Sequence, residues 1–247
     1  MAVAQKTRYR WLDILRGAAV VNMVAFPFCY DWFEVFARQP GWYFLWSSRL
    51  WQQAICCTFI LPAGFSAHLG RRALRHGLIL NLCGLAVSAV TLLALPSEAV
   101  RFGILNLLGC AVLLVWLLRP ALEKLPAAAG LCASLFLFAL TRHLPEGYLG
   151  LLGLRRLELP AGLYRWNALA FLGLPGPTFT SSDYFPLAPW FFLFLAGWFF
   201  CRLARPRLDG FLPRLACPPP EWVGRHSLGL SLIHQPMCMA VCWLLNL

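Results

Sequence analysis

The chain has 247 residues, of which 60% are hydrophobic and 13% are charged, and its mean hydropathy is +0.66. This composition excludes a soluble globular protein, because one soluble core of that length could not bury so much apolar surface; it predicts an all-α, polytopic helical membrane protein. The net charge of +11 comes from 21 lysine and arginine residues clustered between apolar stretches. That pattern is typical of loops facing anionic lipid and argues against a nucleic-acid partner.

Seven apolar segments reach the length of about 20 helical residues that one membrane crossing requires. They are residues 11–36, 52–70, 74–95, 100–118, 125–142, 186–203 and 227–246. The sequence therefore predicts about seven transmembrane helices in a single domain, 1–247, surrounded by membrane lipid. The first segment lacks a small-residue cleavage site, so we expect it to remain as a signal anchor.

Basic residues are distributed unevenly between alternate loops. If the N-terminus is cytoplasmic, the inner loops hold thirteen of the 21 basic residues, which predicts an N-inside, C-outside orientation. The outer loop 143–183 contains an apolar stretch, 157–174, that is interrupted by Pro160, Arg165 and Asn167. It is too broken to cross a bilayer, so we expect an interfacial or re-entrant element there.

The first segment carries charged residues at both ends. Asp13 and Arg16 lie near the end predicted to be cytoplasmic, and because they are three residues apart they share a helix face and can form an ion pair. We interpret this pair either as a clamp at the helix mouth or, through Arg16, as part of a cofactor-binding site. Asp31 lies near the outer end.

The second and sixth segments carry polar residues at their outer ends. Gln52 and Gln53 begin the second segment and are candidates for binding a substrate. Farther along, 62–64 (PAG) predicts either an unwound turn or a close helix contact. Asp183 precedes the sixth segment, where we expect it to cap that helix; it is also a candidate catalytic residue.

The last apolar segment contains a histidine, His234, near its middle. An ionisable group at that depth is costly, so it marks a functional site by default. Arg225 and His226 lie at the cytoplasmic start of this segment, where a helix N-terminus and a cation suit a phosphate group. His226 and His234 are eight residues apart, or roughly 12 Å along a helix. Gln235 is a further candidate for substrate binding.

The ten cysteines do not follow the spacing of metal ligands or of a CxxC motif. Most fall in apolar segments, so we interpret them as small buried hydrophobic residues and expect no metal site.

Short motifs on successive segments give the chain a family resemblance. In chain order they are Arg8-Tyr9-Arg10, 12–17 (LDILRG), Met23-Val24, 59–65, 102–105 (FGIL), 183–186 (DYFP) with Pro189-Trp190, 224–227 (GRHS) and 233–236 (IHQP). Together they resemble the membrane acyltransferases typified by heparan-α-glucosaminide N-acetyltransferase, and most closely the short bacterial members. The resemblance implies transfer of acetyl from cytoplasmic acetyl-CoA, as acyl donor, to a sugar amine or hydroxyl of a glycan acceptor outside a bacterial plasma membrane. The sequence is compatible with either a monomer or a homo-oligomer.

Two positions depart from the family pattern. Relatives usually have a histidine or another polar residue where this chain reads Phe26-Pro27-Phe28, and a serine before the glycine in 62–65 (PAGF). If the missing histidine is the general base, His234 or Asp31 must replace it, or catalysis has been lost. Three hypotheses follow: an acetyl-CoA-dependent acyltransferase, a catalytically impaired binding or assembly protein, and a small transporter.

Overall fold

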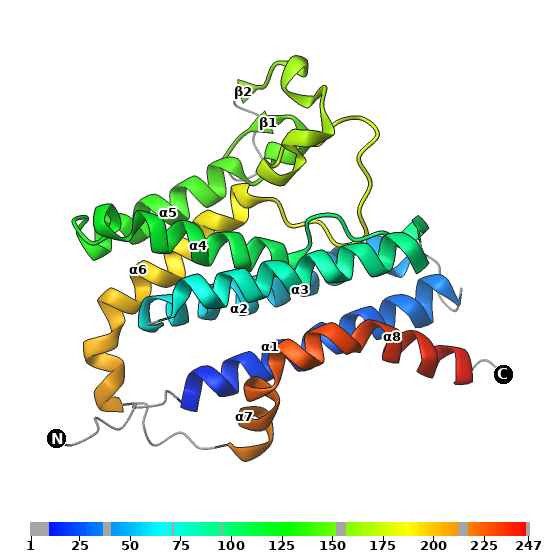
Figure 1. The fold of residues 1–247 in the computed structure, drawn as a ribbon, viewed down its shortest axis with the longest axis horizontal. Helices are drawn as coiled ribbons and strands as arrows, with labels where there is room; N and C mark the ends of the chain where they lie inside the picture. Colours follow the sequence, from blue (N-terminus) through cyan, green and yellow to red (C-terminus); the bar gives the residue numbers. More distant parts are fainter. Residues whose placement is uncertain are drawn as a thin grey trace. The chain divides into compact units, whose positions relative to one another are not determined.

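The computed structural model describes residues 10–36, 41–70, 72–94, 96–151, 157–211 and 217–245. The helices are α1 (Arg10–Tyr30), α2 (Trp46–Leu69), α3 (Ala73–Ala94), α4 (Ile104–Leu122), α5 (Ala127–Thr141), α6 (Leu187–Phe211), α7 (Pro218–Arg225) and α8 (Ser227–Leu245). A π-helical segment, η1 (Asp31–Val35), extends α1. Short 3-10 helices are η2 (Trp42–Phe44), η3 (Pro96–Glu98), η4 (Leu144–Glu146), η5 (Ala161–Tyr164) and η6 (Asn167–Leu172), and the strands are β1 (Tyr148–Leu149) and β2 (Leu157–Glu158). Figure 1 shows these elements in chain order.

The predicted all-α, polytopic membrane fold is confirmed. Within the described residues, five helical stretches are long and apolar enough to cross a membrane, namely Arg10–Glu34, Ala73–Ala94, Ile104–Leu122, Ala127–Glu146 and Leu187–Arg205. Helices α2 and α8 occupy the other two predicted segments, but they are not among these five. The total of seven crossings and the N-inside orientation therefore remain predictions.

The chain divides into two compact units. The first combines Met1–Pro62 with Arg205–Leu247, and the second is Ala63–Ala204. In the second unit, α3 and α4 form a hairpin (Figure 1) because small residues allow close approach. Gly84 lies against the side chain of Asn106, and Gly109 lies against that of Asn81. Each glycine leaves room for an amide, so this contact depends on both residue types.

Helix α2 continues through the proline and glycine that were expected to disturb it. The predicted alternatives at 62–64 were an unwound turn and a close contact, and the structure has the close contact. Gly64 lies against the backbone carbonyl of Phe194 in α6, so any side chain there would collide with main-chain atoms. Phe194 itself is completely buried, and Trp198 and Phe199 are 1% and 2% exposed.

The loop between α5 and α6, which was predicted to lie outside the membrane, contains short elements rather than a long helix. β1 and β2 pair antiparallel, with Tyr148 opposite Glu158, and η5 and η6 follow. Trp166, between these two turns, is 64% exposed. The finding agrees with the expectation that 157–174 is too broken to span, while its interfacial location remains a prediction.

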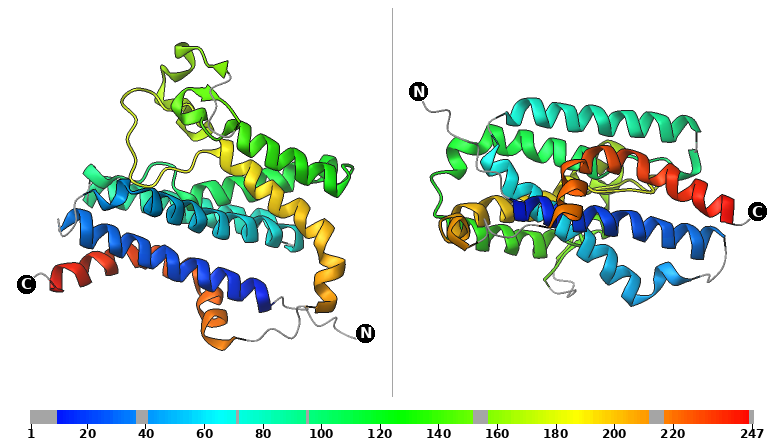
Figure 2. Two further views of the ribbon diagram at one scale, coloured as in Figure 1. Left: turned by 180° about the vertical axis from the view of Figure 1, so that it is seen from behind. Right: turned by 90° about the horizontal axis from the view of Figure 1, so that it is seen from below.

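In the first unit, α8 lies along α1 and α7 packs against the beginning of α1, as Figures 1 and 2 show. Contacts between α1 and α8 run in the same order along both helices. The Ser231 hydroxyl lies 4.0 Å from the Met23 sulfur, the Cys238 thiol lies 3.6 Å from the Val24 carbonyl, and the Cys242 thiol lies 4.0 Å from the Phe28 carbonyl. The two helices are therefore parallel. If both cross the membrane, the number of crossings is odd.

Candidate functional site

His234 lies on the face of α8 that packs against α1. It follows Ser231 by three residues and precedes Cys238 by four, so all three share one side of the helix. The neighbouring contacts are made with Met23 and Val24 of α1. His234 is partly buried and lies one helical turn before Cys238, so it faces α1 about one turn before Val24. Pro27 lies farther along α1, next to Phe28, whose carbonyl contacts Cys242.

A hydrogen bond fixes the state of the His234 ring. Its Nδ1 atom lies 2.8 Å from the backbone carbonyl oxygen of Ser231. Because a carbonyl oxygen can only accept, Nδ1 must carry the hydrogen, and in the neutral ring Nε2 then presents a lone pair. His234 can therefore act as a base through Nε2, and the bond to Ser231 of the same helix orients its ring.

Asp31 lies at the start of η1 and is only 1% exposed. The π-helical turn that it begins closes with the Phe36 amide donating to the Asp31 carbonyl at 3.0 Å. The carboxylate is near enough to the thiols of Cys238 and Cys242 to act on them electrostatically. Asp31 therefore belongs to the same α1–α8 interface as His234, toward its C-terminal end.

Arg225 and His226 occupy a junction rather than the simple helix start that was expected. Arg225 is the last residue of α7, and His226 is the C-cap of that helix. The His226 carbonyl also accepts a hydrogen bond from the Leu230 amide at 3.0 Å, so α8 begins at the same point. The His226 ring packs against Trp222 with 4.6 Å between ring centroids. Helix α7 escaped prediction because its N-terminal run of prolines resembles a loop.

Arg225 shares a buried carboxylate with a second arginine. Its Nη2 atom donates to Glu221 Oε2 at 3.2 Å, and Arg10 Nε lies 3.2 Å from both oxygens of Glu221. The Cys217 amide donates to Oε1 at 3.1 Å. Burial opposes ionisation of Glu221, but the hydrogen bonds and the two positive charges outweigh it and lower its pKa. Glu221 lies in a short polar segment, so its sequence context did not mark it as a candidate residue.

The predicted ion pair at the beginning of α1 is present. Arg16 Nη1 lies 3.4 Å from Asp13 Oδ1, a distance that indicates a loose pair. Asp13 is buried, and its backbone carbonyl lies against Gly224 of α7. Arg16 is therefore held near the α7 docking site, in agreement with either a clamp or a basic contribution to ligand binding.

The positions of the three predicted substrate-binding glutamines do not show what they bind. Gln52 and Gln53 are half-buried in α2, where their neighbour Trp51 donates from Nε1 to Asn22 Oδ1 of α1 at 3.0 Å. Gln235 is in α8, but its side chain lies outside the described part of the structure. Their proposed role in binding a substrate remains a prediction.

Asp183 caps a different helix from the one expected. Helix α6 begins at Leu187, whereas Asp183 Oδ2 accepts a hydrogen bond from the Ile104 amide at 3.2 Å, at the N-terminus of α4. The segment around it is fastened to the chain before α4, since the Ser182 amide donates to the Ala99 carbonyl at 3.2 Å. Burial raises the pKa of Asp183, and the Ile104 hydrogen bond opposes part of that effect. Its predicted catalytic role remains a prediction.

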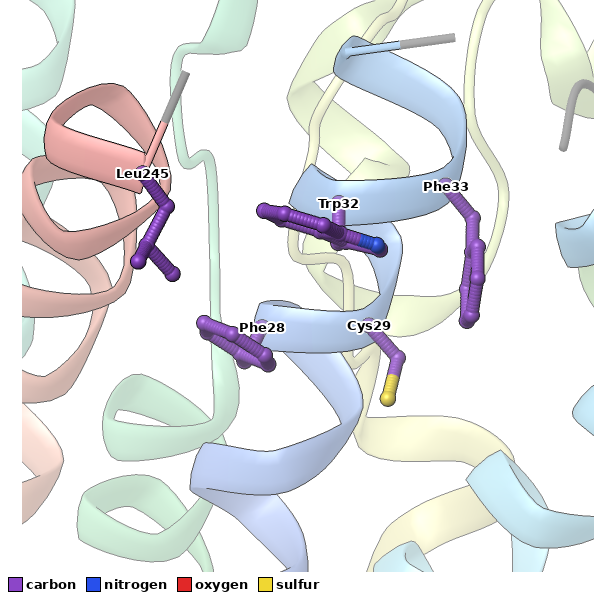
Figure 3. Close-up of a pocket in the computed structure, with 5 residues that line it drawn as sticks. All are labelled: Phe28, Cys29, Trp32, Phe33 and Leu245. Carbon is purple, nitrogen blue, oxygen red and sulfur yellow. The ribbon is translucent and has the colours of Figure 1, made fainter. Parts of the chain in front are cut away.

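A pocket of about 340 Å³ opens at the C-terminal end of the α1–α8 interface. Figure 3 shows Phe28 and Trp32 directed toward Leu245, while Cys29 and Phe33 project from the other side of the same helix. These side chains present almost no polar atoms. A sugar requires several oriented hydrogen bonds, so this pocket is not suited to bind one.

None of the ten cysteines forms a disulfide, and four of them are buried: Cys56, Cys201, Cys238 and Cys242. Cys132 and Cys217 are exposed. Across the described residues, we find no group of three histidine, cysteine or acidic side chains that could hold a metal ion.

Comparison with known protein families matches most of the chain to a family model. The family model described as heparan-alpha-glucosaminide N-acetyltransferase, catalytic, matches residues 8–236. No curated protein and no solved structure matches the chain.

Proposed function

The chain belongs to the heparan-alpha-glucosaminide N-acetyltransferase catalytic family, and from this premise we propose that it transfers an acetyl group from acetyl-CoA to a sugar amine or hydroxyl across a bacterial plasma membrane. Membership of that family and the apolar helices make it an acyltransferase-type membrane protein. Donor, acceptor and location are the proposed parts. The observation that carries the proposal is the position and ring state of His234.

His234 would act as the general base. With its Nδ1 hydrogen bonded to Ser231, Nε2 can take a proton from the acceptor amine or hydroxyl as that group attacks the acetyl carbonyl carbon. As the new C–N or C–O bond forms, the thioester C–S bond breaks, and His234 returns the proton to the departing thiolate. The ring thus ends each cycle in its starting state, and no other reactant is consumed.

The basic junction of α7 and α8 would hold the phosphate end of the acyl donor. Arg225 and His226 are both exposed there, and Arg16 lies on the adjacent turn of α1. Arginine is well suited to phosphate because its planar fork donates two parallel hydrogen bonds. The eight residues from His226 to His234 correspond to roughly 12 Å of helix, which an extended thioester arm must bridge.

The acceptor would approach the same ring from the opposite end of the interface. Gln52 and Gln53 are half-buried in α2, next to Trp51, which bonds Asn22 of α1, and they would supply polar groups for a sugar. Support for this assignment comes from residue chemistry and from the family, whose name specifies a glucosaminide acceptor.

A second hypothesis is a family member without catalytic activity that binds a partner. Pro27 favours it, because a proline inside α1 stands at the position where relatives carry a polar residue and cannot exchange a proton. His234 supplies another imidazole in the same α1–α8 interface, which is why we favour a displaced base over lost chemistry.

The proposal is tested with purified protein reconstituted in lipid vesicles. Acetyl-CoA is added to one side, glucosamine is supplied as the acceptor, and release of the coenzyme A thiol is followed. We expect thiol release that requires glucosamine and forms N-acetylglucosamine. Vesicles that bind acetyl-CoA but form no product with amine or hydroxyl sugars would instead support the non-catalytic hypothesis.

A further inference from the structure

Glu221 is buried at a point where two helices bring arginines together. Its side chain is 3% exposed, whereas the side chains of Arg10 and Arg225 are 46% and 44% exposed. A buried carboxylate is strongly disfavoured unless it is paired and hydrogen bonded. Both arginines are therefore tied to one fixed anion while their outer parts remain open to solvent.

The backbone around Glu221 is also fixed. Gly17 of α1 lies against the backbone carbonyl of Pro220, and Gly224 of α7 lies against that of Asp13. These two contacts flank Glu221 on α7 and leave no room for a side chain at either glycine. Arg225 directly follows one of them, so its Cα position relative to α1 is set by main-chain packing.

The pairing leaves donors and charge unused. Arg10 contacts the carboxylate through Nε, and Arg225 contacts it through Nη2, in the contacts made within the described residues. A guanidinium has five N–H donors, so each retains several. Two positive charges and one negative charge leave a net charge of +1 on this cluster. The two arginines can therefore bind an anion from solvent while Glu221 holds them in place.

We propose that Glu221 is a positioning residue that holds Arg10 and Arg225 side by side as a phosphate-binding pair, with the nucleotide phosphates of the acyl donor as its ligand. The inference rests on the proposed function for the identity of that ligand. It adds Arg10 as a binding residue, and it assigns Glu221 a role that acts through the two arginines.

A purely structural role for Glu221 gives different expectations. If the carboxylate only fastened α7 to α1, its loss would lower stability and would affect every ligand equally. A positioning role affects ligands that carry phosphate groups and spares those that lack them. Coenzyme A and pantetheine form such a pair, because pantetheine has the same thiol arm without the nucleotide.

The test is calorimetric binding to the full-length protein in detergent, with coenzyme A, pantetheine and inorganic pyrophosphate as probes. Arg10→Gln removes one guanidinium. Glu221→Asp retains the charge but shortens the side chain, so one carboxylate can no longer reach both arginines. Arg119→Gln is the matched control, since Arg119 is also 44% exposed and pairs with Glu123 at 2.7 Å.

We expect Arg10→Gln and Glu221→Asp each to weaken coenzyme A and pyrophosphate binding about tenfold, the loss of one charge-assisted hydrogen bond, while pantetheine binding and the control stay unchanged. Thermal unfolding of each variant is measured alongside, and Arg10→Lys is used if Glu221→Asp fails to fold. Lysine retains the charge but lacks the fork, so we expect it to weaken binding as well.

The outcomes separate this inference from the proposed function. Coenzyme A binding that is unaffected by Arg10→Gln and Glu221→Asp overturns the inference and leaves the transferase proposal standing. Pyrophosphate binding that requires Arg10 and Glu221, without any coenzyme A binding, supports the anion site and removes its assigned ligand. The paired site is overturned if neither coenzyme A nor pyrophosphate binds. It is also overturned if the variants weaken pantetheine binding as much as coenzyme A binding.

Discussion

Gly224 of α7 lies in direct contact with the backbone carbonyl of Asp13 in α1, so close that a β-carbon at residue 224 would overlap that oxygen. Because the obstacle is main chain, it cannot move aside as a flexible side chain would. This contact and the equivalent one between Gly17 and Pro220 explain why α7 packs on α1 despite its short, polar sequence.

Gly224→Ala is therefore expected to separate α7 from α1. Overpacking of this kind typically costs about 1–3 kcal/mol, and the separation would also disturb Arg225. We expect a lower thermal unfolding temperature together with weaker coenzyme A binding. Gly229→Ala is the control, since a β-carbon there meets nothing within 4 Å and alanine favours a helix. If Gly224→Ala is as stable as that control, the close packing of α7 on α1 is incorrect.

Replacing Pro27 tests whether the first helix has lost a base. Pro27→His supplies an imidazole in the part of α1 where the family resemblance leads us to expect one, so we expect a higher rate of acetyl transfer. Pro27→Ala restores the missing backbone amide without adding a base, and we expect little change in rate from it. Equal acceleration by both variants, measured as thiol release, would assign the effect to the helix backbone.

Asp183 should affect stability through its cap of α4 and through its burial. Asp183→Ala removes the acceptor for the Ile104 amide and is expected to cost about 1 kcal/mol. Asp183→Asn keeps an acceptor oxygen but cannot ionise. We therefore expect the asparagine variant to retain the cap, as measured by thermal unfolding of the detergent-solubilised protein.

The stability difference between the original protein and Asp183→Asn should depend on pH, because the pKa of Asp183 is shifted in the folded state. Burial raises the pKa of Asp183 above its ordinary value of 3.8, so the folded state binds that proton more tightly than the unfolded state does. The stability contributed by this carboxyl is then greatest below pH 3.8 and is lost as pH rises through the raised pKa. Across that range, Asp183→Asn should become more stable relative to the original protein. A constant difference would contradict the shift.

The sequence predicted what depends on apolar length and missed what depends on packing between distant segments. Long hydrophobic runs located the spanning helices because membrane thickness determines their length. Glu221 was not found, since its significance comes from Arg10, which is 211 positions away in the chain. Asp183 was assigned to the helix that follows it in sequence, yet the loop folds back and delivers it to α4.

His234 was predicted as a candidate from its depth alone, and the structure adds its orientation. Depth in an apolar segment says that an imidazole is costly there, but only the hydrogen bond to Ser231 defines which nitrogen is basic. Its place on the α1 side of α8 required the thiol and hydroxyl contacts of neighbouring residues. Those contacts could not be read from spacing, because spacing does not tell which helix lies alongside.

The central claim is that His234 is the base in acetyl transfer, and the most direct measurement compares the rates of His234→Ala and the original protein in vesicles at equal amounts of folded protein. We predict that the rate falls at least about a hundredfold, as loss of a general base requires, with an unchanged unfolding temperature. His76→Ala, an exposed histidine of α3, should retain the original rate. Transfer by His234→Ala at the rate of the original protein would contradict the account.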